Sequence, residues 1–126
     1  MATKRSNENK DREKRIMTEI IVDSNGPEEQ SMGWYYYLDE NLKFPFTAVC
    51  IEKRVISPLK VKEEVVVLEM APGDECEKEM FVMIRWQRDS LAVPLSQLAP
   101  INSTDEQTKE AVEDWHYWVQ MGYEFG

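Results

Sequence analysis

The chain has 126 residues, of which 42% are hydrophobic and 31% charged, a balance typical of one folded domain rather than of a disordered protein. Residues 1–15 carry six of the 15 basic and three of the 24 acidic residues, so the remaining 111 residues hold nine bases, 21 acids and a net charge of −12. Such an acidic body repels nucleic acids and anionic membranes, which excludes both as partners and favours cations or a basic partner.

Two further features limit the cellular context. The longest apolar stretches are far too short to cross a bilayer, and the N-terminus lacks the apolar core of a secretory signal. We therefore expect a cytoplasmic protein in which Cys50 and Cys76 are free thiols, and two cysteines alone make no zinc site. We assign residues 1–11 to a disordered basic leader and residues 12–126 to a single domain.

Apolar residues with helical spacing follow the leader. Ile16 and Ile20, and likewise Met17 and Ile21, are four positions apart, which predicts a short N-terminal helix from Arg12 onward. The apolar run at the end of this segment is equally compatible with the start of a strand.

A loop and an aromatic cluster come next. Residues 23–29 collect turn formers and predict a loop. Residues 34–37 are all aromatic and residues 44–46 are again apolar, so we expect a core anchor here. Residues 39–41 are predicted to form a polar bend between these two buried stretches.

Four later segments have the composition of strands joined by short connections. They are residues 46–52, 64–70, 79–86 and 91–95. The third alternates between two faces, as a half-buried strand does. The predicted fold class is α+β and mainly β: a small SH3-like antiparallel barrel or sheet, with an N-terminal helix and a C-terminal helix packed on it.

The C-terminal helix has the clearest pattern. Ser103 and Glu106 have the spacing of a capping box, which predicts the N-terminus of a helix. One face of this helix is expected to dock on the sheet and holds Ala111, Trp115, Trp118, Val119 and Gly122.

Carboxylates recur in adjacent pairs. Calcium takes six to eight oxygen ligands at flexible geometry, so several carboxylates brought together on loops and helix ends suit this ion. The pairs are Glu28–Glu29, Asp39–Glu40, Glu63–Glu64, Asp74–Glu75, Asp105–Glu106 and Glu113–Asp114. A solvated acidic surface is the alternative interpretation of each pair.

An EF-hand is excluded. Asp23 begins a loop-like sequence, but Gly26 occupies loop position 4 instead of 6, and Trp34 stands where the bidentate glutamate belongs. Any calcium site must therefore combine separate segments. In the C-terminal helix, like charges at helical spacing destabilise one another by about 0.2–0.5 kcal/mol per pair, and Lys109 is the only cation within the helix to offset them.

Three blocks of the sequence resemble a known family. The blocks GWYYYLDENLKFPF (33–46), MFVMIRW with LAVPLSQL (80–86 and 91–98) and AVEDWHYWVQMGYEF (111–125) resemble the cyanobacterial CcbP calcium-binding proteins. The resemblance implies a compact, largely β protein that binds Ca²⁺ without EF-hands and buffers it in the cytoplasm as part of calcium signalling. It makes residues 12–126 a single calcium-binding domain. The ligands it implies are Asp39, with Glu40 beside it, then Asp114, and upstream Asp23, Glu28 and Glu29.

Two other functions compete with this interpretation. Aromatic residues 34–37 and Trp86 on an SH3-like fold are also compatible with an adaptor that binds peptides in an aromatic groove. Catalysis is not expected, because His116 stands alone and the sequence lacks a phosphate loop or nucleophile elbow.

Overall fold

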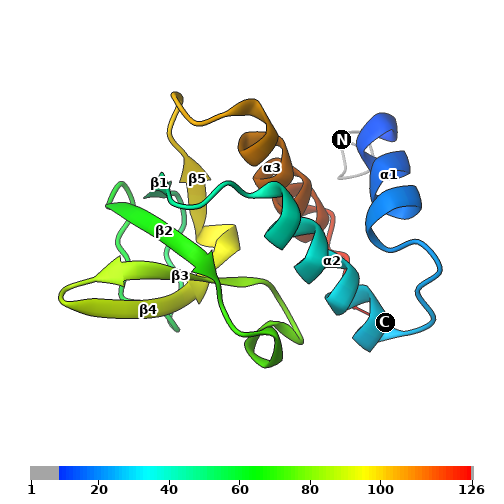
Figure 1. Cartoon of the computed structure of the whole chain (residues 1–126), viewed down its shortest axis with the longest axis horizontal. Coiled ribbons are helices and arrows are strands. Elements are labelled where there is room, and N and C mark those ends of the chain that lie inside the picture. Colours follow the sequence, from blue (N-terminus) through cyan, green and yellow to red (C-terminus); the bar gives the residue numbers. More distant parts are fainter. Residues whose placement is uncertain (1–8, 126) are drawn as a thin grey trace, which may run out of the picture.

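The computed structural model describes residues 9–125, in which a sheet lies on one side and helices on the other. Helices α2 and α3 run side by side in the middle of the molecule, and α1 covers them on the side away from the sheet (Figure 1). The helical elements are α1 (Lys10–Arg15), the π-helical turn η2 (Ile16–Ile20), α2 (Pro27–Asn41), the 3-10 turns η3 (Gly73–Cys76) and η4 (Leu95–Gln97), and α3 (Glu106–Gln120).

The sheet is antiparallel and has the strand order β4-β3-β2-β1-β5. Its strands are β1 (Phe46–Cys50), β2 (Glu64–Met70), β3 (Phe81–Trp86), β4 (Asp89–Pro94) and β5 (Leu98–Pro100). The predicted antiparallel sheet and the predicted α+β class are confirmed, although the sheet is open rather than a closed barrel. The short β5 was not predicted as a separate strand, because three residues ending in proline give no alternation to recognise.

The N-terminal helix is present and starts earlier than expected. Helix α1 begins at Lys10, where the side chain of Asn9 accepts a hydrogen bond from the backbone N–H of Arg12 at 2.9 Å. The predicted leader therefore overlaps α1 at residues 10–11, while residues 1–8 lie outside the described part of the chain. Ile16 and Ile20, on the following turn η2, are buried in the core.

Gly33 is the point at which α2 passes closest to η2. A Cβ atom on Gly33 would overlap the backbone carbonyl oxygen of Ile20. The close approach of these two segments therefore requires a glycine at this position.

Helix α2 corrects two of the expectations. The predicted loop at residues 23–29 is shorter than expected, because α2 begins at Pro27. The predicted polar bend at residues 39–41 is wrong, because these residues form the last turn of a 15-residue helix. The aromatic run masked the helical period, although Ser31, Trp34 and Leu38 are the residues that α2 buries, at spacings of three and four. Tertiary packing overrides the modest helix propensity of aromatic residues here.

The C-terminal helix forms as predicted but with a different cap, and two residues of its predicted buried face, Val119 and Gly122, are exposed. Asp105, rather than Ser103, accepts a hydrogen bond from the backbone N–H of Thr108 at 2.9 Å and caps α3. Trp115 and Trp118 point into the core and pack on Trp34 of α2, with ring centroids 5.0 Å and 5.6 Å apart. These three rings, the tryptophan cluster, join the two central helices.

The remaining expectations concern thiols and membranes. Cys50 and Cys76 are both buried and form no disulfide. No helix within residues 9–125 combines the length and the apolar character needed to span a bilayer.

His116 gives the fold a pH dependence. Burial lowers the pKa of this imidazole, an effect that nearby backbone groups of Leu95 and Leu98 partly offset. The unfolded chain takes up this proton near pH 6.5, whereas the folded chain resists it, so the free energy of unfolding falls as the pH falls through this region.

We expect urea unfolding to show this loss of stability between about pH 7.5 and pH 5.5, where ordinary carboxylates stay ionised. His116 is the only histidine of the chain, so His116→Gln should flatten the dependence. An equally steep dependence in the variant would show that another group causes it.

Candidate metal site

The last turn of α2 carries two of the predicted ligands. Asp39 and Glu40 are exposed, and the turn contains no basic residue. A helix C-terminus has partial negative charge and unpaired carbonyl oxygens, so two carboxylates at this end are electrostatically unfavourable without a cation. Neither side chain forms an ion pair with any residue in the range 9–125.

Tyr35, one turn before Asp39 on α2, connects this helix to the end of β2. Its hydroxyl donates a hydrogen bond to the backbone carbonyl of Ala71 at 2.8 Å, which ties α2 to the segment that follows β2. Burial raises the pKa of Tyr35, and the charges of Cys76, Asp39 and Glu69 raise it further. The charges of Asp39 on α2 and Glu69 on β2 therefore both raise the pKa of the Tyr35 hydroxyl.

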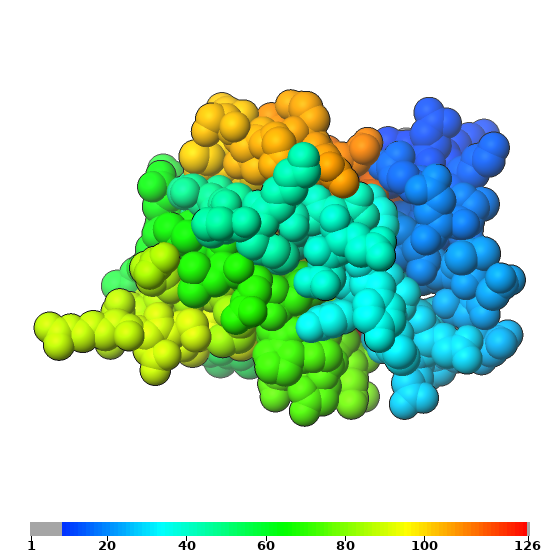
Figure 2. Space-filling model, in the orientation of Figure 1, coloured from blue at the N-terminus to red at the C-terminus, as the bar shows by residue number. Residues whose placement is uncertain are grey.

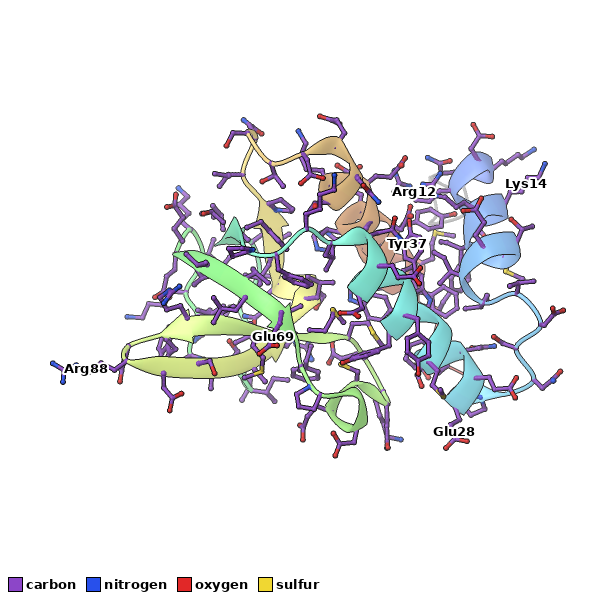
Figure 3. The ribbon with its side chains drawn as sticks, viewed as in Figure 1. Arg12, Lys14, Glu28, Tyr37, Glu69 and Arg88 are labelled. Carbon is purple, nitrogen blue, oxygen red and sulfur yellow. The ribbon has the colours of Figure 1, made fainter. Side chains whose placement is uncertain are left out.

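Sequence reasoning missed Glu69. The residue interrupts an apolar strand with an exposed charge, and the register between β2 and β3 shifts between Val67 and Glu69. A bulge of this kind re-aims a side chain. Figure 3 shows Glu69 at the end of β2 that approaches α2. An isolated charge in an otherwise apolar strand was the signal that could have revealed it.

The other end of α2 holds three more of the predicted residues. Glu28 and Glu29 lie in the first turn, where the helix dipole favours negative charge. Glu29 also accepts a hydrogen bond from the backbone N–H of Asn25 at 2.8 Å, and Asp23 occupies the preceding loop with a left-handed φ of 59°. Glu28 and Asp39 are eleven positions apart on the helix, about 16 Å, so the two ends of α2 do not share one ion.

A pocket of about 320 Å³ lies between the first half of α2 and η3. Figure 2 shows these two segments in contact at the lower edge of the molecule. Carboxylates reach this pocket from both sides: Glu28 from the helix, and Asp74 and Glu77 from the β2–β3 connection. Asp74 and Glu77, which were not among the six predicted ligands, therefore lie beside the N-terminal half of α2.

Asp114 is fully buried and already neutralised. Its carboxylate accepts hydrogen bonds from Arg12 at 2.7 Å, from Arg15 at 2.7 Å and 3.1 Å, and from the Tyr37 hydroxyl at 2.6 Å. We call this group of four residues the Asp114 cluster. Burial and the hydrogen bond to Asp114 raise the pKa of Tyr37, and the Asp114 carboxylate raises the pKa of Arg15.

The acidic face of α3 is likewise balanced by cations of the protein. Arg12 lies 3.5 Å from Glu113 and Arg15 lies 3.4 Å from Glu110. Lys109, within the helix, pairs with Glu106. The repulsion expected among the acids of α3 is therefore relieved mainly by α1.

The six predicted ligands thus lie in three places. Asp39 and Glu40 are at the C-terminal end of α2, Asp23, Glu28 and Glu29 are at its N-terminal end, and Asp114 is beneath α1. Within residues 9–125, no three Asp, Glu, His or Cys side chains converge tightly enough to hold a metal ion. Ion binding at any of these places requires side-chain movement, which the exposure of the α2 carboxylates permits.

The aromatic residues do not line a groove. Trp34 is completely buried, and the hydroxyls of Tyr35 and Tyr37 donate hydrogen bonds within the fold, so only Tyr36 of this run is largely exposed. Trp86 lies far from them, beside the β1–β2 connection. This arrangement gives no support to a peptide-binding adaptor built on these rings.

Comparisons with known proteins agree with the resemblance described above. The model of the CcbP family, described as calcium binding, matches residues 14–119, which is most of the chain. Among curated proteins, none gives a significant match.

Two solved structures share both the fold and much of the sequence. A crystal structure of Anabaena CcbP is 44% identical, with a TM-score of 0.82, and the match covers 94% of this chain and 96% of that chain. A calcium-binding protein in its calcium-binding form is 42% identical, with a TM-score of 0.82 and 98% coverage of both chains. The chain therefore belongs to the CcbP family of calcium-binding proteins.

Proposed function

We propose that this protein binds Ca²⁺ without an EF-hand, mainly through Asp39 and Glu40, and that it buffers the ion in the cytoplasm as part of calcium signalling. The proposal rests on Asp39 and Glu40, two exposed carboxylates at the negatively charged end of α2 that form no ion pair within residues 9–125. Membership of a calcium-binding family supports the identity of the ion. The function is binding, with no catalytic step.

The donor set at this end of α2 suits calcium. Asp39 and Glu40 supply carboxylate oxygens, the helix end supplies carbonyl oxygens, and Glu69 extends toward the same region from β2. Calcium accepts such a mixture and completes its shell with water. Magnesium is less well served because it demands near-ideal octahedral geometry and loses its water reluctantly.

The other predicted ligands rank below Asp39 and Glu40. Glu28, Glu29 and Asp23, together with the pocket acids Asp74 and Glu77, offer a second, weaker location for a cation. Asp114 would become a ligand only if it released both arginines, so we rank it last.

Calorimetric titration with Ca²⁺, against a Mg²⁺ control, tests the proposal. We expect Asp39→Asn to weaken calcium binding by about tenfold or more, because it removes one ligand charge from the site. Glu64→Gln is the matched control: it also removes one exposed carboxylate, but at the start of β2, about 16 Å along the strand from Glu69.

The results separate the parts of the proposal. If the wild-type protein binds Ca²⁺ no better than Mg²⁺, calcium binding itself is refuted. If Asp39→Asn and Glu64→Gln bind equally well, the ion lies elsewhere on the protein. Buffering is tested in cells with a fluorescent calcium reporter, where the wild-type protein should damp an imposed calcium transient and Asp39→Asn should damp it less.

A further inference from the structure

The connection between β1 and β2 exposes an unusual amount of apolar surface. Nine large hydrophobic side chains are exposed within residues 9–125, and four of them lie in this connection. They are Ile51 (49% exposed), Val55 (102%), Ile56 (61%) and Val61 (52%). The exposure of two adjacent aliphatic side chains, Val55 and Ile56, has no role in folding.

Basic residues gather around this apolar surface. Nine basic residues lie beyond residue 15, and six are in or next to this connection and the β3–β4 hairpin. Arg54 pairs with Glu79, which leaves five others. These five are Lys53, Lys60, Lys62, Arg85 and Arg88, all exposed, and none forms an ion pair within the described residues.

The two segments are neighbours in space. A shallow pocket of about 540 Å³ is lined by Lys60, Val61, Lys62 and the carboxylate Glu63 of the connection and by Trp86 at the end of β3. Arg88, at the hairpin tip, is the outermost labelled side chain on this side of the molecule (Figure 3), and the tip projects beyond the body in Figure 2. We call this surface, formed by residues 51–62 and 85–88, the basic–apolar end.

The connection is anchored, so its exposed residues are presented by the fold. Leu59 is completely buried, and Arg54 forms an ion pair with Glu79 at 2.8 Å. The side-chain amide of Gln97 donates to the backbone carbonyl of Glu52 at 2.9 Å. A loop held at several points loses little conformational entropy on binding.

We propose that the basic–apolar end docks an acidic segment of a partner protein that also carries aliphatic or aromatic side chains. Unpaired cations attract the acidic groups of such a segment, while Val55, Ile56 and Trp86 supply the apolar contact. The choice rests on charge complementarity. Residues 51–62 and 85–88 hold six bases and one acid, Glu52, and border on Glu63, Glu64 and Asp89, while the other residues from 16 onward hold three bases and 20 acids.

The same charges disfavour two other occupants. A bilayer with anionic lipids is an extended plane that repels the acidic remainder of the protein, whereas a short segment lies within one Debye length, about 8 Å, of the basic side chains. A second copy docked through the same surface would place five cations against five cations.

An NMR titration with a defined probe tests this proposal. The probe is a short synthetic peptide in which Glu and Asp alternate with Leu and Phe, and the control peptide has Lys in place of each acid. We expect amide shifts confined to residues 51–62 and 85–88, weaker in high salt, with the acidic peptide only. The double variant Val55→Ser/Ile56→Ser, which changes exposed side chains, should bind the peptide about tenfold more weakly while keeping the wild-type spectrum elsewhere.

Every other outcome overturns the proposal. Equal binding of both peptides, or shifts located on α2 or α3, would assign the interaction to another surface. Cosedimentation with phosphatidylserine vesicles, lost in the double variant, would identify a membrane as the occupant. Concentration-dependent self-association lost in the same variant would identify a second copy.

Discussion

Asp114→Asn is expected to lower the free energy of unfolding by about 3–5 kcal/mol, the usual cost of leaving buried charges without their partner. The substitution removes the only fully buried charge in the Asp114 cluster and leaves the guanidinium groups of Arg12 and Arg15 facing each other. Their side chains are only 17% and 24% exposed, so solvent compensates little. Urea unfolding measures the loss, and limited proteolysis should show α1 becoming accessible first.

Glu110→Gln provides the matched control. It removes a carboxylate that contacts the same Arg15, but one that is 57% exposed, so the expected loss is below about 1 kcal/mol. If Asp114→Asn is no less stable than Glu110→Gln, the cluster does not stabilise the attachment of α1. Calcium titration of a folded Asp114→Asn sample also tests the low rank given to Asp114 as a ligand.

Gly33→Ala should destabilise the protein by about 1–3 kcal/mol, as overpacking does in a close-packed interior. Alanine is a better helix former than glycine by about 1 kcal/mol, so helix propensity alone predicts the opposite sign. The new methyl group would overlap the carbonyl oxygen of Ile20, which belongs to the backbone and can move only with η2. Thermal unfolding measures the change.

Gly73→Ala is the control for this substitution, because its added Cβ would make only an ordinary contact with Tyr35. A stabilised Gly33→Ala protein would mean that η2 moves aside at little cost. Since Gly33→Ala and Asp114→Asn both loosen the N-terminal segment, their combined effect should be smaller than the sum of the two.

Much of the fold was predictable from local pattern. Strand-like composition identified four of the strands, the third also by its alternation, and helical spacing identified the N-terminal and C-terminal helices. Helix α2 escaped because four consecutive aromatic residues hide the period that Trp34 and Leu38 share. Its helical state depends on burial against α3, which a local pattern does not contain.

The candidate site was predictable only in part. Paired acids drew attention to Asp39 and Glu40, and their position at a helix C-terminus became visible only with the fold. Asp114 ranked directly behind them in sequence, since nothing local indicates that Arg12 and Arg15, about a hundred positions away, neutralise it. Glu69 was missed because a β-bulge, rather than a neighbouring acid, brings it toward α2.

The tryptophan cluster has a practical consequence for studying this protein. Three of the four tryptophans lie where α2 meets α3, the two helices that carry Asp39 and Asp114. Indole emission depends on solvent contact and on neighbouring groups, so the intrinsic fluorescence arises largely from this one helix–helix contact. The protein therefore contains its own optical reporter, and changes at either carboxylate can be followed without a label.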